Sequence, residues 1–201
     1  YLFGFGNLVF SDSVHYEFQI PKKDLMKFVR ENDGSPMTVV AAIMAKALYR
    51  ALPKNKLPLR IETNHNYRAE VSCPKTHHDL LSHIFLLVPH QAQDWPIKRI
   101  CTVLRGSTYL QTQPEYAYET LRRFYDYTDV VDGVKGLKNK MFENLGVGDN
   151  FCISLMQMNK KTKYMDYFCQ ILEEENIPYK ILGIFKNHLP ISKVKSAPIY
   201  N

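Results

Sequence analysis

Segments with the two-residue period of a β-strand alternate along this chain with segments that have the 3.6-residue period of an α-helix. Strand-like alternation occurs at residues 16–20, 57–67 and 150–158, and a final strand is expected at residues 178–184. Helical stripes occupy much of the sequence between them. Interleaving of this kind predicts the α/β or α+β class, and we take it as α/β, with a mixed sheet and flanking helices.

The most specific local signal is the start of a helix at Ser35-Pro36. Serine is a favoured N-cap residue, and proline is favoured at the first helical position. The apolar stripe that follows comprises Val40, Ile43, Met44, Ala47, Leu48 and Ala51. The many alanines predict that one face of this helix packs closely on a sheet, and Pro53 predicts its end.

Other elements are expected from weaker patterns. Residues 84–88 are apolar at every position, which predicts a central strand with both faces covered. Further helices are expected after Pro21, after an Asp94 cap, from Pro114, over residues 136–145 and after a Thr162 cap. The buried stripes of the second and third of these helices are expected to include Val103 and Tyr118.

Composition limits the class of protein further. The chain has 201 residues, 45% of them hydrophobic and 23% charged, so we interpret residues 1–201 as a single domain or lobe with its own core. The longest apolar run, residues 39–45, is far shorter than the roughly 18 residues of a membrane span, so no membrane partner is expected. The 4 cysteines form no Cys-x-x-Cys pair and no signal peptide opens the chain, so we expect reduced thiols in the cytoplasm.

The residues alone supply no complete catalytic set. Histidines 65, 77, 78, 83 and 90 match no zinc-ligand spacing, so we interpret them as loop or strand-end residues and expect no metal. Glycines 4 and 6 precede extended sequence, and glycines 146 and 148 predict a turn, so neither pair fits a phosphate-binding loop. Ser107 has no Gly-x-Ser-x-Gly elbow around it, and a Cys–His nucleophile pair is left open.

The net charge of +6 fits a partner that bears phosphates or carboxylates. Two lysine clusters contribute to it: one at residues 135, 138 and 140, and one that comprises Lys160, Lys161 and Lys163. No nucleic-acid-binding motif accompanies them, so they are interpreted as solvated basic surface and nucleic acid is not expected as a partner.

Three stretches resemble the C-terminal lobe of the chloramphenicol-acetyltransferase-like superfamily, which includes condensation domains and alcohol-acetyltransferase-like proteins. They are YEFQIPKKDLMKFVRENDGSPMTVVAAIMAKALYRAL, PLRIETNHNYRAEV and DNFCISLMQMNKKTKYMDYFCQILEEENIPYKI. In the second, Asn66-Tyr67-Arg68 is similar to the Asn-Leu-Arg of the family's "I-x-V-P-V-N-L-R" strand. The three stretches cover somewhat under half of the chain, and their order matches the family.

The resemblance implies one lobe of a two-lobe acyltransferase or condensation enzyme. Such an enzyme transfers an acyl group from a coenzyme A or carrier-protein thioester to an alcohol or amine, with no tightly bound cofactor. Arg68 would support the catalytic site by pairing with the aspartate of the family's HHxxxDG motif, with Asn66 beside it. Lys160, Lys161 and Lys163 would dock the donor or an acyl carrier protein.

The chain also departs from the family. It contains no HHxxxDG motif, and His77-His78-Asp79 lacks the downstream Asp-Gly. We therefore expect the catalytic N-terminal lobe to lie outside this chain, and whether the chain is part of an active enzyme is left open. Two alternatives remain: a non-catalytic module that docks an acidic carrier protein or partner, and an unrelated small-molecule-binding protein.

Overall fold

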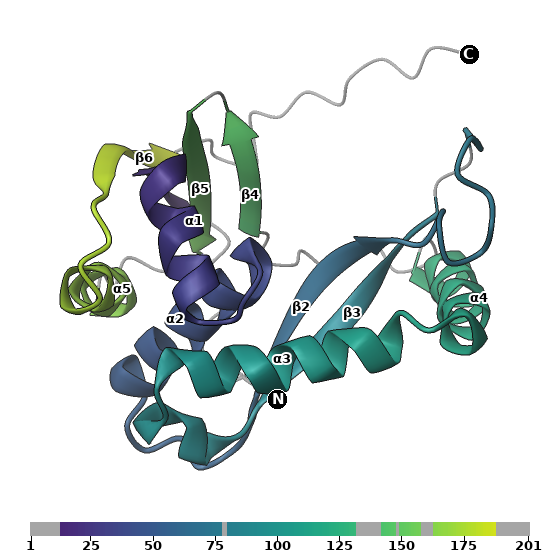
Figure 1. Cartoon of the computed structure of the whole chain (residues 1–201), viewed down its shortest axis with the longest axis horizontal. Helices are drawn as coiled ribbons and strands as arrows, with labels where there is room; N and C mark the ends of the chain where they lie inside the picture. Colours follow the sequence, from purple (N-terminus) through teal and green to yellow (C-terminus); the bar gives the residue numbers. More distant parts are fainter. Residues whose placement is uncertain (1–12, 78–79, 132–141, 148, 158–162, 188–201) are drawn as a thin grey trace. The chain divides into compact units, whose positions relative to one another are not determined.

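The computed structural model describes residues 13–77, 80–131, 142–147, 149–157 and 163–187 (Figure 1). The chain divides into two compact units, each of which is described by itself. The first comprises residues 1–24, 139–162 and 178–201, and the second comprises residues 25–138 and 163–177.

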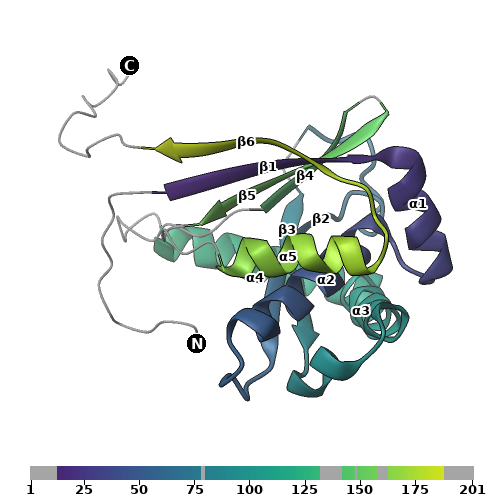
Figure 2. The same cartoon turned by 90° about the vertical axis from the view of Figure 1, so that its left-hand side faces the viewer.

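The first unit contains a four-stranded sheet in the order β4-β5-β1-β6 (Figure 2). Its strands are β1 (Ser13–Pro21), β4 (Phe142–Val147), β5 (Asn150–Gln157) and β6 (Lys180–Asn187). β1 pairs antiparallel with both β5 and β6, and β4 pairs antiparallel with β5. The strand predictions for residues 16–20 and 178–184 are confirmed, the latter with a start at Lys180. The prediction for residues 150–158 is confirmed as far as Gln157, and residue 158 lies outside the described part of the chain.

The prediction of a helix over residues 136–145 is wrong for the residues that the structure describes. Residues 142–145 belong to β4, which forms a tight hairpin with β5 through the facing pair Val147 and Asn150. Residues 136–141 lie outside the described part of the chain. The ladder with β5 supplies hydrogen-bond partners for this segment, so its weak helical pattern does not decide its structure.

The second unit combines five helices with a two-stranded sheet in the part of the chain that the structure describes. Its helices are α1 (Lys22–Glu31), most of which lies in this unit, α2 (Pro36–Ala51), α3 (Ile97–Gln111), α4 (Pro114–Val131) and α5 (Lys163–Glu174). Its strands are β2 (Leu59–Asn66) and β3 (Leu81–Val88), and a 3₁₀ helix spans His90–Asp94. α3 and α4 pack against β3, and α5 packs against α2 (Figure 1).

The predicted start of α2 is confirmed in detail. Ser35 is the N-cap, its hydroxyl accepts a hydrogen bond from the Thr38 amide at 3.2 Å, and Thr38 Oγ1 accepts one from the Ser35 amide at 2.8 Å. The expectation of one buried face is wrong, because residues 38–45 are buried in an unbroken run. α2 is contacted by α5, α3 and the 3₁₀ helix, which cover it from several sides.

The expectation that both faces of residues 84–88 are covered is also wrong. β3 alternates between buried and more exposed side chains, and Leu87 is 55% exposed while Leu86 and Val88 are buried. β2 alternates in the same way, so α3 and α4 cover one face of the sheet and the other face stays open in the described structure. The predicted strand over residues 57–67 is confirmed with shorter bounds.

Two details of the later helices need correction. Pro96 rather than Asp94 is the N-cap of α3, because two extended residues separate Asp94 from the first helical turn. Val103 and Tyr118 are exposed, and Cys101, Ala117 and their helical neighbours occupy the buried positions instead.

Candidate functional site

The candidate site lies where β2 ends and the chain enters a turn over residues 67–72. The Asn66 side-chain oxygen Oδ1 accepts a hydrogen bond from the Arg68 amide at 3.1 Å and another from Arg68 Nη1 at 3.0 Å. Arg68 Nε donates to the Thr76 carbonyl at 3.3 Å. The structure therefore places Asn66 and Arg68 together, with the half-buried guanidinium oriented by two neighbouring acceptors.

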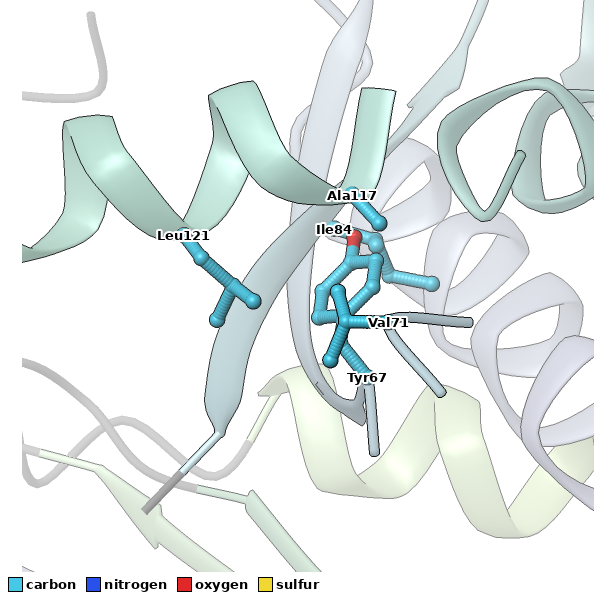
Figure 3. Packing of buried hydrophobic residues seen from close by; sticks show 5 residues of the cluster. All are labelled: Tyr67, Val71, Ile84, Ala117 and Leu121. Carbon is cyan, nitrogen blue, oxygen red and sulfur yellow. The ribbon is translucent and has the colours of Figure 1, made fainter. Parts of the chain in front are cut away.

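Tyr67, between these two residues, anchors the turn. Its side chain is fully buried in a cluster with Val71, Ile84, Ala117 and Leu121, and Figure 3 shows the ring between α4 and the turn. Its amide donates to the Leu80 carbonyl at 2.9 Å, and its hydroxyl donates to the Gln111 carbonyl at 3.2 Å. Burial raises the pKa of the Tyr67 hydroxyl, so this group serves as a neutral donor.

A histidine–carboxylate pair lies beside the turn, and the sequence did not point to it. His65 Nε2 is 2.9 Å from Glu70 Oε1, and the His65 ring packs edge-on against Tyr67 with centroids 4.7 Å apart. Both side chains are less than a third exposed, and Glu70 Oε2 is buried without a hydrogen-bond partner in the described structure. A carboxylate that holds an imidazole in this way fixes its orientation and tautomer, as pairs that move protons require.

The open face of the β2–β3 sheet carries two further polar contacts. The Arg60 guanidinium lies 3.8 Å from the centroid of the Phe85 ring, and His83 Nδ1 lies 3.3 Å from Glu62 Oε1. Within the residues that the structure describes, no group of three or more His, Cys, Asp or Glu side chains is placed to hold a metal ion.

The docking residues expected from the sequence are only partly described. Lys163 is the first residue of α5, is exposed, and has its Nζ 5.8 Å from the centroid of the Tyr167 ring. Lys160 and Lys161 lie outside the described residues, as do lysines 135, 138 and 140 and the histidine at 78. None of the helices in the described segments is long and apolar enough to cross a membrane.

Comparison with known proteins finds solved structures with a similar fold, but no protein-family model and no curated protein with a matching sequence. TRI101 of F. graminearum, solved with coenzyme A and T-2 mycotoxin, superposes with a TM-score of 0.58 and 11% identity, over 85% of this chain and 50% of that one.

A condensation domain that mediates chain release from the enacyloxin polyketide synthase matches with a TM-score of 0.48 and 8% identity, over 95% of this chain and 44% of its own. The chain thus spans about half the length of either solved protein. At 11% identity the likeness to TRI101 concerns the fold alone, and the chain has the mixed α/β fold of the chloramphenicol-acetyltransferase-like type that is expected from its sequence.

Proposed function

We propose that this chain is one lobe of an acyltransferase or condensation-type enzyme, which transfers an acyl group from a coenzyme A or carrier-protein thioester to an alcohol or an amine. The observation that supports this function is the likeness in fold to TRI101 over 85% of the chain. That protein was solved with coenzyme A and a mycotoxin bound, and this chain corresponds to half of its length.

The reaction requires a base, a stabilised oxyanion and an aligned acceptor. The acceptor hydroxyl or amine adds to the thioester carbonyl as its proton passes to the base. The C–S bond then breaks, and the base returns the proton to the leaving sulfur, which releases the thiol. We expect the base to be a histidine of the lobe outside this chain. The residues of this chain bind and orient that lobe and its substrates.

Arg68 is the residue that we assign to this support. A guanidinium holds a carboxylate through two parallel hydrogen bonds and stays charged when it is buried. Asn66 Oδ1 and the Thr76 carbonyl already restrict the Arg68 side chain, so less rotamer freedom is lost when a carboxylate of the other lobe binds it. Asn66 therefore acts as a positioning residue for Arg68.

The test uses the intact native protein that contains this chain. Its mass is measured first, and then release of thiol from acyl-coenzyme A is followed with alcohol and amine acceptors. Arg68→Ala is expected to lower both turnover and melting temperature, because loss of one partner of a buried ion pair costs about 3–5 kcal/mol. Arg68→Lys is expected to restore part of each, since lysine keeps the charge and loses the fork.

Arg60→Ala is the matched control, because Arg60 is an exposed arginine that stacks on Phe85 and lies in β2, the strand that leads into the turn with Arg68. It is expected to leave turnover within about twofold of the native value, as exposed charges contribute little. If Arg68→Ala behaves like Arg60→Ala in both measurements, the assigned role of Arg68 is wrong. If the intact native protein turns over no acyl thioester, the proposed enzyme is wrong.

A non-catalytic module that docks an acidic carrier protein is the second candidate, and the net charge of +6 and the exposed Lys163 favour it. Calorimetry with an acyl carrier protein at two salt concentrations distinguishes the two functions. Binding that weakens with salt, without any turnover, would favour the module. Replacement of Lys160, Lys161 and Lys163 by Glu is expected to weaken that binding more than it lowers the free energy of unfolding.

A further inference from the structure

The outward face of α3 differs from an ordinary solvated helix surface. The helix buries Ile97, Ile100, Cys101 and Leu104 against the second unit. Its exposed positions are Lys98, Arg99, Thr102, Val103, Arg105, Gly106, Tyr109 and Leu110. This set combines cations with large apolar side chains and contains no acidic residue.

The cations lie mainly on the N-terminal half of this face. Lys98 Nζ pairs with Asp33 Oδ2 at 2.8 Å. The Arg99 guanidinium lies 4.0 Å from the centroid of the Trp95 ring, which holds its side chain in place. Arg99 and Arg105 form no ion pair with the described residues, although Arg105 lies near enough to Asp33 to help lower the pKa of that carboxyl. The charge of Arg99 is therefore available to an acidic partner, and that of Arg105 is partly offset by Asp33.

The apolar residues continue the face toward the end of the helix. Arg99, Val103, Gly106 and Leu110 follow one another at intervals of four, three and four residues, the spacing of a stripe that contacts another helix. Leu110 is 61% exposed and Tyr109 beside it 65%. Tyrosine and arginine are, with tryptophan, the side chains that most often contribute large binding energies at protein–protein interfaces.

Gly106 lies in the middle of this stripe, where nothing in the described packing requires a glycine. A Cβ added at this position would meet no atom within 4 Å. A glycine inside a helix costs roughly 0.5–1 kcal/mol relative to alanine. The absence of a side chain at Gly106 would let the backbone of a partner approach α3 closely. Such an approach would explain the glycine, which the packing of the described residues does not.

We propose that the outward face of α3 docks an amphipathic helix of a protein partner whose apolar stripe is flanked by Asp and Glu. Val103 and Leu110 supply the apolar contacts, Gly106 allows the close approach, and Arg99 and Arg105 select acidic flanks by charge complementarity. This interaction does not depend on acyl transfer, and it can hold whether or not the proposed function does.

The test uses the full chain and a synthetic helical peptide of about 20 residues with Leu and Ala in its stripe and Glu at the flanking positions. A second peptide carries Lys in place of Glu. Fluorescence anisotropy is expected to show binding of the Glu peptide, weaker at high salt, and no binding of the Lys peptide. Leu110→Glu and Arg105→Glu are each expected to weaken binding at least about tenfold.

Leu57→Glu is the matched control, since Leu57 is also 61% exposed and belongs to the loop before β2 rather than to α3. It is expected to change the affinity less than about twofold. Gly106→Ala separates docking from folding: it is expected to raise the melting temperature of the chain and to weaken peptide binding.

Three outcomes would overturn the proposal. One is equal or absent binding of the two peptides. Another is a loss of affinity for the Glu peptide that is as large with Leu57→Glu as with Leu110→Glu. The third is concentration-dependent dimerisation of the chain alone that Leu110→Glu abolishes, because the occupant would then be a second copy.

Discussion

Gln111, the last residue of α3, closes the outer edge of β3 with its side-chain amide. Its Oε1 accepts a hydrogen bond from the Phe85 amide at 2.9 Å, and its Nε2 donates to the Phe85 carbonyl at 2.8 Å. Nε2 also lies 3.1 Å from both the carbonyl and the hydroxyl oxygen of Ser107. The amide thus takes the place of a neighbouring strand at Phe85.

Gln111→Glu keeps the shape of this side chain and removes its donor. The Phe85 carbonyl then loses its main partner, which costs about 1–3 kcal/mol, and it faces a carboxylate oxygen that repels it. We expect the free energy of unfolding to fall by about 2–4 kcal/mol at neutral pH. For a chain of this length that lowers the melting temperature by about 4–16 °C.

The pH dependence gives a second check. A protonated glutamate can donate to the Phe85 carbonyl, so the folded-state pKa of the introduced carboxyl lies above its unfolded value of about 4.3. The free energy of unfolding of the variant is therefore higher at pH values below the unfolded pKa than it is at neutral pH. This stability is lost as the pH rises through the folded pKa.

Urea unfolding of the native chain and the variant at several pH values measures both effects. Gln113→Glu is the control, because Gln113 lies between α3 and α4 and its Nε2 makes a solvent-exposed hydrogen bond to the Tyr109 carbonyl at 2.9 Å. Gln113→Glu is expected to lower the free energy of unfolding by less than about 0.5 kcal/mol. Equal losses for the two variants, or a loss at Gln111 that does not vary with pH, would refute the edge-closing role.

Three further results are expected. Ser35→Ala removes the N-cap of α2 and should lower the free energy of unfolding by about 1 kcal/mol in urea titrations. Hydrogen bonds from Arg50 lower the pKa of the Glu174 carboxyl. At pH values above the unfolded pKa of that carboxyl, this pair should therefore add well under 1 kcal/mol to the free energy of unfolding. Its contribution is lost as the pH falls through the folded pKa, and Arg50→Gln titrated with acid should lack this loss. Burial raises the pKa of Cys101 to about 11, so mass spectrometry after alkylation at pH 8 should find Cys73 modified and Cys101 intact.

The helices and strands that local signals specify were predictable, and those that depend on distant contacts were not. Ser35-Pro36 marks the start of α2 because the N-cap hydrogen bond forms within three residues. The strand over residues 142–147 exists because β5 offers it a ladder, and nothing within its own sequence signals that ladder. Leu87 belongs to an unbroken apolar run, so its exposure depends on which side α3 and α4 cover.

The same distinction holds at the candidate site. Asn66 and Arg68 were found through a family resemblance, and the structure joins them in one hydrogen-bonded turn. The pairing of Glu70 with His65 was not predicted, because it arises only when the turn folds Glu70 back toward His65. The turn depends on a hydrogen bond from the Val71 amide to the Tyr67 carbonyl at 3.0 Å and on the positive φ of Ser72, neither of which has a sequence motif.

The position of Arg68 depends on contacts far from it, because the turn that holds Arg68 begins where the pairing of β2 with β3 ends. The Tyr67 amide donates to the Leu80 carbonyl and Arg68 follows it in the turn, so a slip of one residue in the pairing of β2 with β3 would change where the turn begins and where both side chains lie. Two remote residues oppose such a slip. The Tyr49 hydroxyl of α2 donates to the last carbonyl of β3 at 2.8 Å and accepts from the first amide of β2 at 3.2 Å. Gln111 of α3 holds Phe85 in the middle of β3. The place where the turn begins is therefore set by the register that these two helices support in the sheet, and Asn66 and the Thr76 carbonyl then orient the guanidinium of Arg68.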